Sequence, residues 1–285
     1  MTALTTILVL ITILVLLDSE KSFPAPIAVS DPEMQYTTNS GTILPPLLGE
    51  RDGVRASISS NTAADCVILL HGLARTSLSM KGVEWYLKRR GYRVVNARYP
   101  THGLSVEQIS ETYLAPLLQS EIPRSSAKIN FVTHSQGGIV LRQYLSDHDL
   151  PNLGRVVMLA PPNHGTEIVD RLQASRVARP FLGPGYLQLG TSADSLPNRL
   201  GPIQFDCGII AGDCSLNPLL SRMLTGPNDG KVTVASAQLD GMRDFLVLHY
   251  SHTWLMWRKN TLHQIQCFLQ AGRFEHQIPP VPAGS

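Results

Sequence analysis

One serine lies in a local pattern that could make it a nucleophile. Ser135 is part of FVTHSQGGIV, residues 131–140, between a run of strand-forming residues and two glycines. A serine hydroxyl is a poor nucleophile at neutral pH unless a base removes its proton. One arrangement that exposes such a hydroxyl is the nucleophile elbow, a strained turn between a strand and a helix, with small residues two positions before and after the serine. Gly137 meets this requirement, whereas Thr133 is larger than the usual glycine, so we expect the helix to lie slightly further from the strand.

The chemistry also needs a histidine as base and a carboxylate that orients it. In folds built on such an elbow, the acid and then the histidine follow the serine, on loops after late strands. GPNDGKVTVASA, residues 226–237, supplies Asp229 in a turn, and RDFLVLHYSHTWLMW, residues 243–257, supplies His252 just past an apolar strand. We therefore predict that Ser135, Asp229 and His252 form a catalytic triad.

Other acids and histidines compete for these roles. Asp240 follows an apolar stretch but leaves room for little more than one strand before the predicted base, and Asp213 lies just beyond the apolar run CGIIAG. Both acids stay open as weaker alternatives. His249 falls inside a strand pattern, where we expect a packed or hydrogen-bonded side chain. His134 is the neighbour of the serine and cannot easily turn back as its base, so we expect it to pack or hydrogen-bond beneath the elbow.

The oxyanion formed during attack on a carbonyl needs fixed hydrogen-bond donors. One candidate is the backbone N–H of Gln136, which begins the helix after the nucleophile, where free amides and the helix dipole favour negative charge. The second should come from the loop after an early strand. The stretch LLHGLARTS ends a strand at His71 and Gly72, so the N–H of Leu73 is the best candidate and that of Ala74 the runner-up.

The elements that must position these residues alternate along the chain. Short apolar runs typical of strands buried on both faces occur at CVILLHG (66–72), YRVVNARYP (92–100), KINFVTH (128–134), GRVVMLAPP (154–162) and CGIIAG (207–212). Helical stretches lie between them at SLSMKGVEWYLKRRGY, with Gly91 as the expected C-cap, at 105–120 and at 136–147. This alternation predicts an α/β fold with a mostly parallel central sheet flanked by helices. Residues 163–206 interrupt it, and we expect either a substrate cap or a surface excursion that only packs on the core.

Together these stretches resemble the lipase/esterase branch of the α/β-hydrolase superfamily. The matching segments, within about residues 64–270, are LLHGL, THSQGG, LAPPNHGTE and PNDGKV with SHT, and THSQGG is similar to the elbow of bacterial triacylglycerol lipases. The resemblance implies an α/β-hydrolase fold, the same nucleophile, acid and base, and the same two oxyanion donors. Thr133 departs from the family pattern, and no second acidic cluster near NDG suggests a calcium site.

The ends of the chain differ in composition from the predicted hydrolase domain at 51–274. Residues 1–21 contain a run from Thr2 to Leu17 without charge, and we predict a membrane-targeting segment, either a signal peptide or an uncleaved anchor. Residues 22–50 are rich in proline and predict a linker. Residues 275–285 form a tail. We therefore expect an exported or membrane-associated protein.

Composition narrows the chemistry further. The chain has 285 residues, 43% of them hydrophobic and 16% charged, with a net charge of +2, which argues against disorder and against a nucleic-acid partner. Its four cysteines lack the C-x-x-C spacing of zinc sites, so we predict no metal and no other cofactor. If the domain is exported, Cys207 with Cys214 is the disulfide most worth testing.

The sequence thus predicts a serine hydrolase that cleaves carboxylic esters through an acyl-enzyme, with an ester or lipid as substrate. Alternatives with the same triad are an acyltransferase, a thioesterase or a phospholipid acyl hydrolase. A non-enzymatic, membrane-tethered binding module is the alternative from another class.

Overall fold

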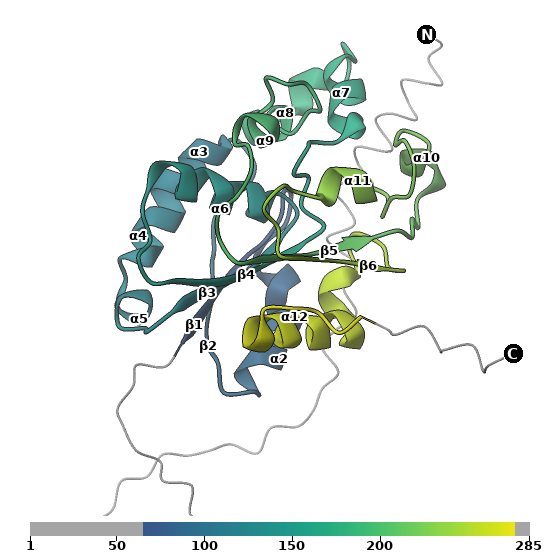
Figure 1. Cartoon of the computed structure of the whole chain (residues 1–285). Coiled ribbons are helices and arrows are strands. Elements are labelled where there is room, and N and C mark those ends of the chain that lie inside the picture. Colours follow the sequence, from purple (N-terminus) through teal and green to yellow (C-terminus); the bar gives the residue numbers. More distant parts are fainter. Residues whose placement is uncertain (1–64, 277–285) are drawn as a thin grey trace, which may run out of the picture.

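Six strands form one parallel sheet in the computed structural model, which describes residues 65–276 (Figure 1). Across the sheet their order is β2-β1-β3-β4-β5-β6, and every neighbouring pair is parallel. In chain order they are β1 (Cys66–Leu70), β2 (Arg93–Asn96), β3 (Ile129–His134), β4 (Leu153–Leu159), β5 (Cys207–Gly212) and β6 (Asp244–Leu248). The predicted α/β fold with a parallel sheet is confirmed.

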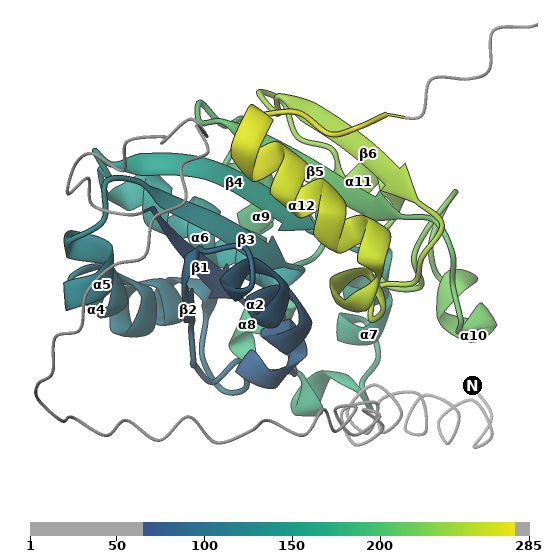
Figure 2. The same cartoon turned by 90° about the horizontal axis from the view of Figure 1, so that it is seen from below.

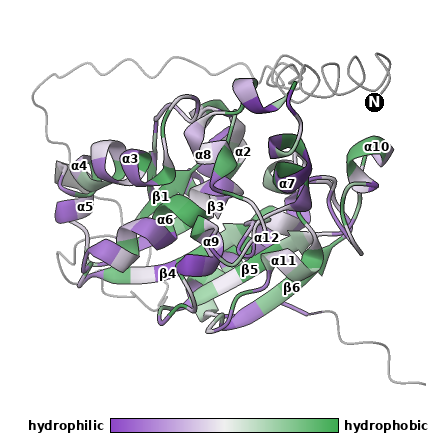
Figure 3. Cartoon of the chain, turned by 90° about the horizontal axis from the view of Figure 1, so that it is seen from above, coloured by the Kyte–Doolittle hydropathy of each residue, from purple (hydrophilic) through white to green (hydrophobic). Residues whose placement is uncertain are grey.

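Helices cover both faces of this sheet, which is why its central strands are apolar without alternation. On one face lie α3 (Val106–Ile109), α4 (Ala115–Leu118) and α6 (Gln136–Asp147), and on the other lie α2 (Lys81–Lys88) and α12 (Lys259–Ala271) (Figures 1 and 2). Every residue of β1, β3 and β5 is buried. Figure 3 shows hydrophobic residues concentrated along β1 and β5, whereas a surface helix such as α7 (Glu167–Gln173) carries both kinds.

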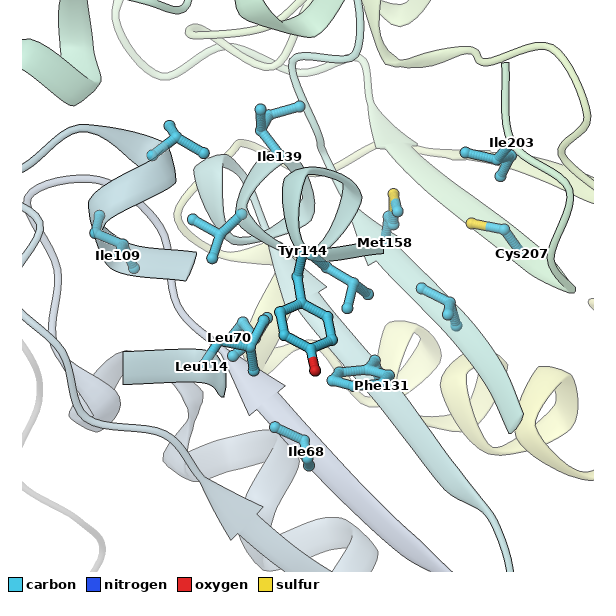
Figure 4. Close-up of a cluster of buried hydrophobic side chains, with 14 of the residues drawn as sticks. Ile68, Leu70, Ile109, Leu114, Phe131, Ile139, Tyr144, Met158, Ile203 and Cys207 are labelled. Carbon is cyan, nitrogen blue, oxygen red and sulfur yellow. The ribbon is translucent and has the colours of Figure 1, made fainter. Parts of the chain in front are cut away.

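The two faces have separate hydrophobic cores, and strand β1 contributes to both. Ile68 belongs to the core beneath α6, together with Phe131 (Figure 4), whereas the next residue, Leu69, belongs to the core beneath α2 and α12 with Phe268. Successive side chains of a strand point to opposite faces, which explains this division. Each such side chain contributes about 1.5–3 kcal/mol when it is fully buried.

The predicted helical stretches are present, with two differences in detail. The stretch 105–120 is divided by a π-helical turn, η2 (Ser110–Leu114), between α3 and α4, and it begins at a capping box in which Ser105 and Gln108 cap each other. The C-cap of α2 is Arg89 rather than Gly91. Gly91 nevertheless takes the left-handed conformation, with φ of 85°, that reverses the chain into β2.

Shorter elements connect the sheet and its helices. The stretch between β4 and β5 contains α7, η3 (Arg179–Phe181), α8 (Pro184–Leu187) and α9 (Leu196–Arg199). The remaining elements are η1 (Ser77–Met80), α5 (Glu121–Arg124), α10 (Pro218–Ser221), α11 (Val234–Ala237) and η4 (Leu255–Trp257). The interruption predicted at 163–206 is therefore a set of short helices.

Cys207 and Cys214, the pair most worth testing for a disulfide, are not bonded to each other. All four cysteines are free. Cys207 is the first residue of β5, and Cys214 lies beyond its last residue, Gly212. A strand advances by about 3.3 Å per residue, so the two residues lie at opposite ends of β5, well beyond the ~7 Å between Cα atoms that a disulfide allows.

The predicted membrane-targeting segment at 1–21 and the linker at 22–50 lie outside the described residues, as does the tail beyond residue 276. Among residues 65–276, no helix combines the length and the apolar character that crossing a bilayer requires.

Candidate active site

Ser135 occupies a strained turn between β3 and α6. Its φ of 54° and ψ of −126° lie in a region that residues other than glycine rarely adopt, and such strain costs on the order of 1–3 kcal/mol. The backbone N–H of Ser135 donates to the carbonyl of Leu159 at the end of β4, which anchors the turn to the sheet. Gly72 makes room for it, because a Cβ at this glycine would lie 2.9 Å from the Ser135 Cβ. The sheet therefore holds the serine in a conformation that it would not adopt alone.

Glycines on helix α6 allow the helix to approach the sheet despite the bulky Thr133. A Cβ at Gly137 would lie 2.6 Å from the carbonyl oxygen of Leu70, so α6 packs directly on the end of β1. A Cβ at Gly138 would lie 3.2 Å from the Thr133 hydroxyl. Because Gly138 has no side chain, it leaves room for the Thr133 side chain between strand and helix. In the usual elbow that room comes from a glycine at the position of Thr133.

Asp229 and His252 form a buried pair. The Nδ1 atom of His252 lies 2.7 Å from Oδ2 of Asp229, and the two residues are 3% and 2% exposed. The other carboxylate oxygen of Asp229 accepts the backbone N–H groups of Lys231 and Val232 at 2.9 and 2.8 Å. The backbone N–H of His252 donates to the Asp229 carbonyl at 3.0 Å. The pair is therefore held by backbone and side chain together.

The environment of His252 keeps its imidazole neutral. Burial lowers the pKa of His252, and this outweighs the hydrogen bond and the charge of Asp229, which raise it. Because Asp229 accepts the proton on Nδ1, the ring presents Nε2 as the unprotonated nitrogen. A neutral imidazole in this tautomer is the form that can accept a proton from a hydroxyl.

Ser135 and His252 line the same pocket, at the carboxyl end of the sheet. In the described part of the chain, no hydrogen bond joins the Ser135 hydroxyl to the His252 ring. The contact between nucleophile and base is often loose in sites without substrate. The structure thus brings the three predicted triad residues to one place, with the acid and base already bonded.

The backbone hydrogen bonds near Ser135 discriminate between Leu73 and Ala74, the two candidate oxyanion donors in the loop after β1. The N–H of Ala74 donates to the Thr101 hydroxyl at 2.9 Å. Within residues 65–276, the N–H of Leu73 has no such acceptor. Gln136 is the first residue of α6, so no carbonyl of the same helix reaches its N–H. Leu73 and Gln136 are therefore the better placed pair of donors.

The two alternative acids and His249 lie elsewhere. Asp213 and His249 pair with each other, with 2.9 Å between the carboxylate and Nδ1, and the His249 side chain is 80% exposed. We expected His249 within the strand, but β6 ends at Leu248. Asp240 is exposed. None of these three lines the pocket of Ser135.

His134 lies beneath the elbow and contacts the base. Its Nε2 lies 3.0 Å from the backbone carbonyl oxygen of His252, and the two rings are 4.7 Å apart. Burial, and then the neighbouring His252, hold the pKa of His134 well below its usual value. A neutral ring with its proton on Nε2 donates to that carbonyl, so His134 ties the loop of His252 to strand β3.

The pocket beside Ser135 is apolar and has a volume of about 140 Å³. Much of its lining comes from the stretch between β4 and β5, and includes Ile168, Val169, Leu172, Phe181, Tyr186 and Leu189. The side chain of Gln136 donates to the Gly185 carbonyl at 3.1 Å, which ties this stretch to the elbow helix.

Sequence reasoning did not single out two cationic residues that line the pocket, Arg75 and Lys231. The guanidinium of Arg75 donates to the Thr253 hydroxyl at 2.8 Å, next to the base. Both residues lie within the segments that carry predicted site residues, LLHGLARTS and GPNDGKVTVASA, and this proximity in sequence was the available signal.

Comparison with known proteins supports the fold. No protein-family model matches the sequence, and no curated protein matches it. The mature form of Bacillus licheniformis lipase BlEst2 is similar in structure, with a TM-score of 0.58 and 18% identity over 77% of this chain and 96% of that chain. Aspergillus fumigatus lipase B has a TM-score of 0.56 and 17% identity over 73% of this chain and 52% of that chain. Legionella pneumophila phospholipase PlaB has a TM-score of 0.50 and 19% identity over 61% of this chain and 46% of that chain.

At these identities the likeness concerns the fold. The chain has the α/β-hydrolase fold, as the resemblance of its motifs implied. It spans about half the length of the fungal lipase and less than half of the phospholipase.

Proposed function

We propose that the protein is a serine hydrolase that cleaves carboxylic esters through an acyl-enzyme, with Ser135, Asp229 and His252 as its triad. The observation that carries this proposal is the buried pair of His252 and Asp229, 2.7 Å apart, at the pocket that also holds the strained serine. A buried aspartate bonded to Nδ1 of a histidine fixes the tautomer that a serine nucleophile needs.

In the first half of the proposed reaction, His252 Nε2 takes the proton of Ser135 as the hydroxyl oxygen attacks the ester carbonyl carbon. The electron pair of the C=O bond moves to its oxygen, which the N–H groups of Leu73 and Gln136 stabilise. The tetrahedral intermediate then breaks its bond to the alcohol oxygen, which receives the proton from His252. An acyl group remains on the serine.

In the second half, water replaces the alcohol. His252 takes a proton from the water as its oxygen attacks the acyl carbon, and the same backbone donors stabilise the second oxyanion. When the bond to the serine oxygen breaks, His252 returns the proton to Ser135 and the carboxylic acid leaves. Asp229 stays ionised throughout and stabilises the imidazolium that forms in each half.

The apolar pocket favours an ester with a hydrocarbon chain. Side chains such as Ile168, Leu172 and Phe181 offer no hydrogen bonds to a sugar or a peptide, but they can cover an acyl chain. Transfer of the acyl group to another alcohol, or cleavage of a thioester or a phospholipid, would use the same steps. Product analysis in the presence of a competing alcohol separates transfer from hydrolysis.

A Ser135→Ala variant tests the proposed nucleophile. We expect it to lose nearly all turnover of a short acyl p-nitrophenyl ester, and all labelling by a fluorophosphonate probe, while its circular dichroism spectrum is unchanged. Ser146→Ala is the matched control, because Ser146 lies on the same helix and donates only to Gln143 and Asp147. Undiminished turnover in the Ser135 variant would end the proposal.

The apolar run between Thr2 and Leu17 motivates a further part of the proposal, that the enzyme is directed to a membrane or exported. Labelling of cell fractions with the same probe tests it. The labelled protein should be found in the membrane or exported fraction, and label confined to the cytosol contradicts it.

A further inference from the structure

A second cluster of reactive side chains lies on helix α12, away from the pocket. His263 and Cys267 are four residues apart and therefore share one face of the helix. The Cys267 sulfur lies 3.5 Å from Nε2 of His263, and the same nitrogen lies 2.8 Å from Oε2 of Glu275. One possible metal-ligand atom from each of the three residues can be chosen so that these atoms lie within 4.8 Å of one another. Among residues 65–276, no other group of three or more His, Cys, Asp or Glu side chains meets this condition.

The fold itself places Glu275 beside the helix. The chain reverses at Gly272, which ends α12 with a φ of 69°. Phe274 is then buried against Phe268, with ring centroids 5.0 Å apart. The side chain of Gln264 bonds both backbone groups of Glu275, accepting its N–H at 2.8 Å and donating to its carbonyl at 2.9 Å. The carboxylate therefore approaches the helix because its backbone is fixed there.

Contrary to the expectation of no metal that the cysteine spacing gave, we propose that His263, Cys267 and Glu275 bind a zinc ion. The set offers one thiolate, one imidazole and one carboxylate, the three ligand types that Zn²⁺ takes in proteins. Ligands at about 2.0–2.3 Å around a tetrahedral ion lie roughly 3.3–3.8 Å from one another. The separation of sulfur and nitrogen, 3.5 Å, already falls in this range. The Glu275 oxygen lies 2.8 Å from the ring nitrogen and within 4.8 Å of the sulfur, so this exposed carboxylate must shift to complete the site.

The ion would take the place of the Cys267 thiol proton, which passes to solvent because the metal binds the thiolate. The proton of the His263 ring, which lies between Nε2 and Glu275, moves to Nδ1. The lone pair of Nε2 is then available to the metal. Three protein ligands leave a fourth position for water, and the bound ion would clamp the chain after α12 onto the helix.

Titration of the full chain with Zn²⁺, purified under reducing conditions without metal, tests the proposal. Isothermal titration calorimetry should show one ion per chain, and Co²⁺ in its place should give a thiolate charge-transfer band in the near ultraviolet. Cys267→Ser and His263→Ala should each weaken Zn²⁺ binding by roughly ten-fold or more, and the cysteine variant should lose the Co²⁺ band.

Matched controls exist for both ligand types. Cys214→Ser removes another partly exposed thiol, and His276→Ala removes another exposed imidazole, one that pairs with Asp244. Neither should change Zn²⁺ affinity, and ester turnover should be unchanged in every variant because α12 does not line the pocket. The proposal is overturned if the chain does not bind Zn²⁺, or if binding survives in both Cys267→Ser and His263→Ala.

Discussion

The hydrogen bond from His134 to the backbone of His252 leads to a quantitative prediction. His134 is fully buried, and its Nε2 lies 3.0 Å from the His252 carbonyl oxygen. The base is therefore held at three points: at Nδ1 by the Asp229 carboxylate, at its N–H by the Asp229 carbonyl, and at its carbonyl by His134. Only the last of these can be removed without touching the proposed triad.

A His134→Leu substitution fills a similar volume but leaves the buried carbonyl of His252 without a donor. An unsatisfied buried acceptor costs about 1–3 kcal/mol. If that cost is relieved by movement of the loop, the His252 ring leaves the position from which it reaches Ser135. If this cost of about 1–3 kcal/mol were added in full to the activation free energy, kcat would fall by roughly 5- to 150-fold, since about 1.4 kcal/mol equals a factor of ten.

A His134→Gln variant should restore much of the loss. The amide nitrogen of glutamine can occupy the position of the histidine Nε2 and donate to the same carbonyl. We therefore expect the kcat of the glutamine variant to lie between those of the leucine variant and the unsubstituted protein. It should not reach the latter, because both variants lose the ring contact with His252.

The assay is kcat for a p-nitrophenyl ester at a temperature where all variants are folded, together with the free energy of unfolding in urea. The leucine variant should lose both activity and stability, and its rate of fluorophosphonate labelling should fall with kcat. A leucine variant that loses stability but keeps full kcat would refute the positioning role, as would a glutamine variant as inactive as the leucine variant.

Three further predictions follow from the site. Asp229→Asn should lower kcat by about 10³- to 10⁴-fold with little change in KM, because the amide favours the wrong tautomer of His252; steady-state kinetics measure this, and a loss below ten-fold contradicts it. Gly137→Ala should destabilise the fold by at least about 1–3 kcal/mol in urea, because the new Cβ would meet a backbone carbonyl at 2.6 Å that cannot rotate away; a stability equal to the parent contradicts it. Burial lowers the pKa of His71, His134 and His252 below 6.5 in the folded chain. As the pH falls below 6.5, the unfolded chain therefore binds more protons than the folded chain does. The free energy of unfolding should therefore decrease below pH 6.5, by at most about 1.4 kcal/mol per pH unit for each histidine, and the acid limb of kcat/KM should lie below pH 6.5; a stability that is constant between pH 7 and 5 contradicts the first expectation.

Local features of the sequence were sufficient for the elbow. The run before Ser135 is apolar without alternation, which predicts a strand buried on both faces, and a helix begins directly after the serine. The strand and the helix depend on preferences within those residues, so both can be inferred from them, whereas the strained φ of Ser135 is held by its contact with β4. The role of Gly138 beside Thr133 could not be inferred, because it depends on the distance at which α6 packs on the sheet.

The choice of acid depended on the tertiary structure. Asp213, Asp229 and Asp240 all follow apolar stretches or lie in turns, so local patterns rank them only weakly. The structure brings Asp229 to His252 because Asp229 follows β5 and His252 follows β6, and these two strands are adjacent and parallel, so the segments after their carboxyl ends can meet. The same dependence explains why Cys207 and Cys214 do not meet, since extension of β5 separates cysteines that are close in sequence.

The sequence alone predicts the alternation of strands and helices, the position of the turn at Ser135 and the order of the candidate residues along the chain. Periodicity, glycine placement and strand propensity act between near neighbours, and they can be evaluated without knowledge of the packing. The packing sets the strain at Ser135, the carboxylate that meets His252, the contact of His134 with the His252 carbonyl, and the return of Glu275 to His263 and Cys267. Those contacts join residues from separate elements, and their geometry follows from how the elements pack rather than from any one of them.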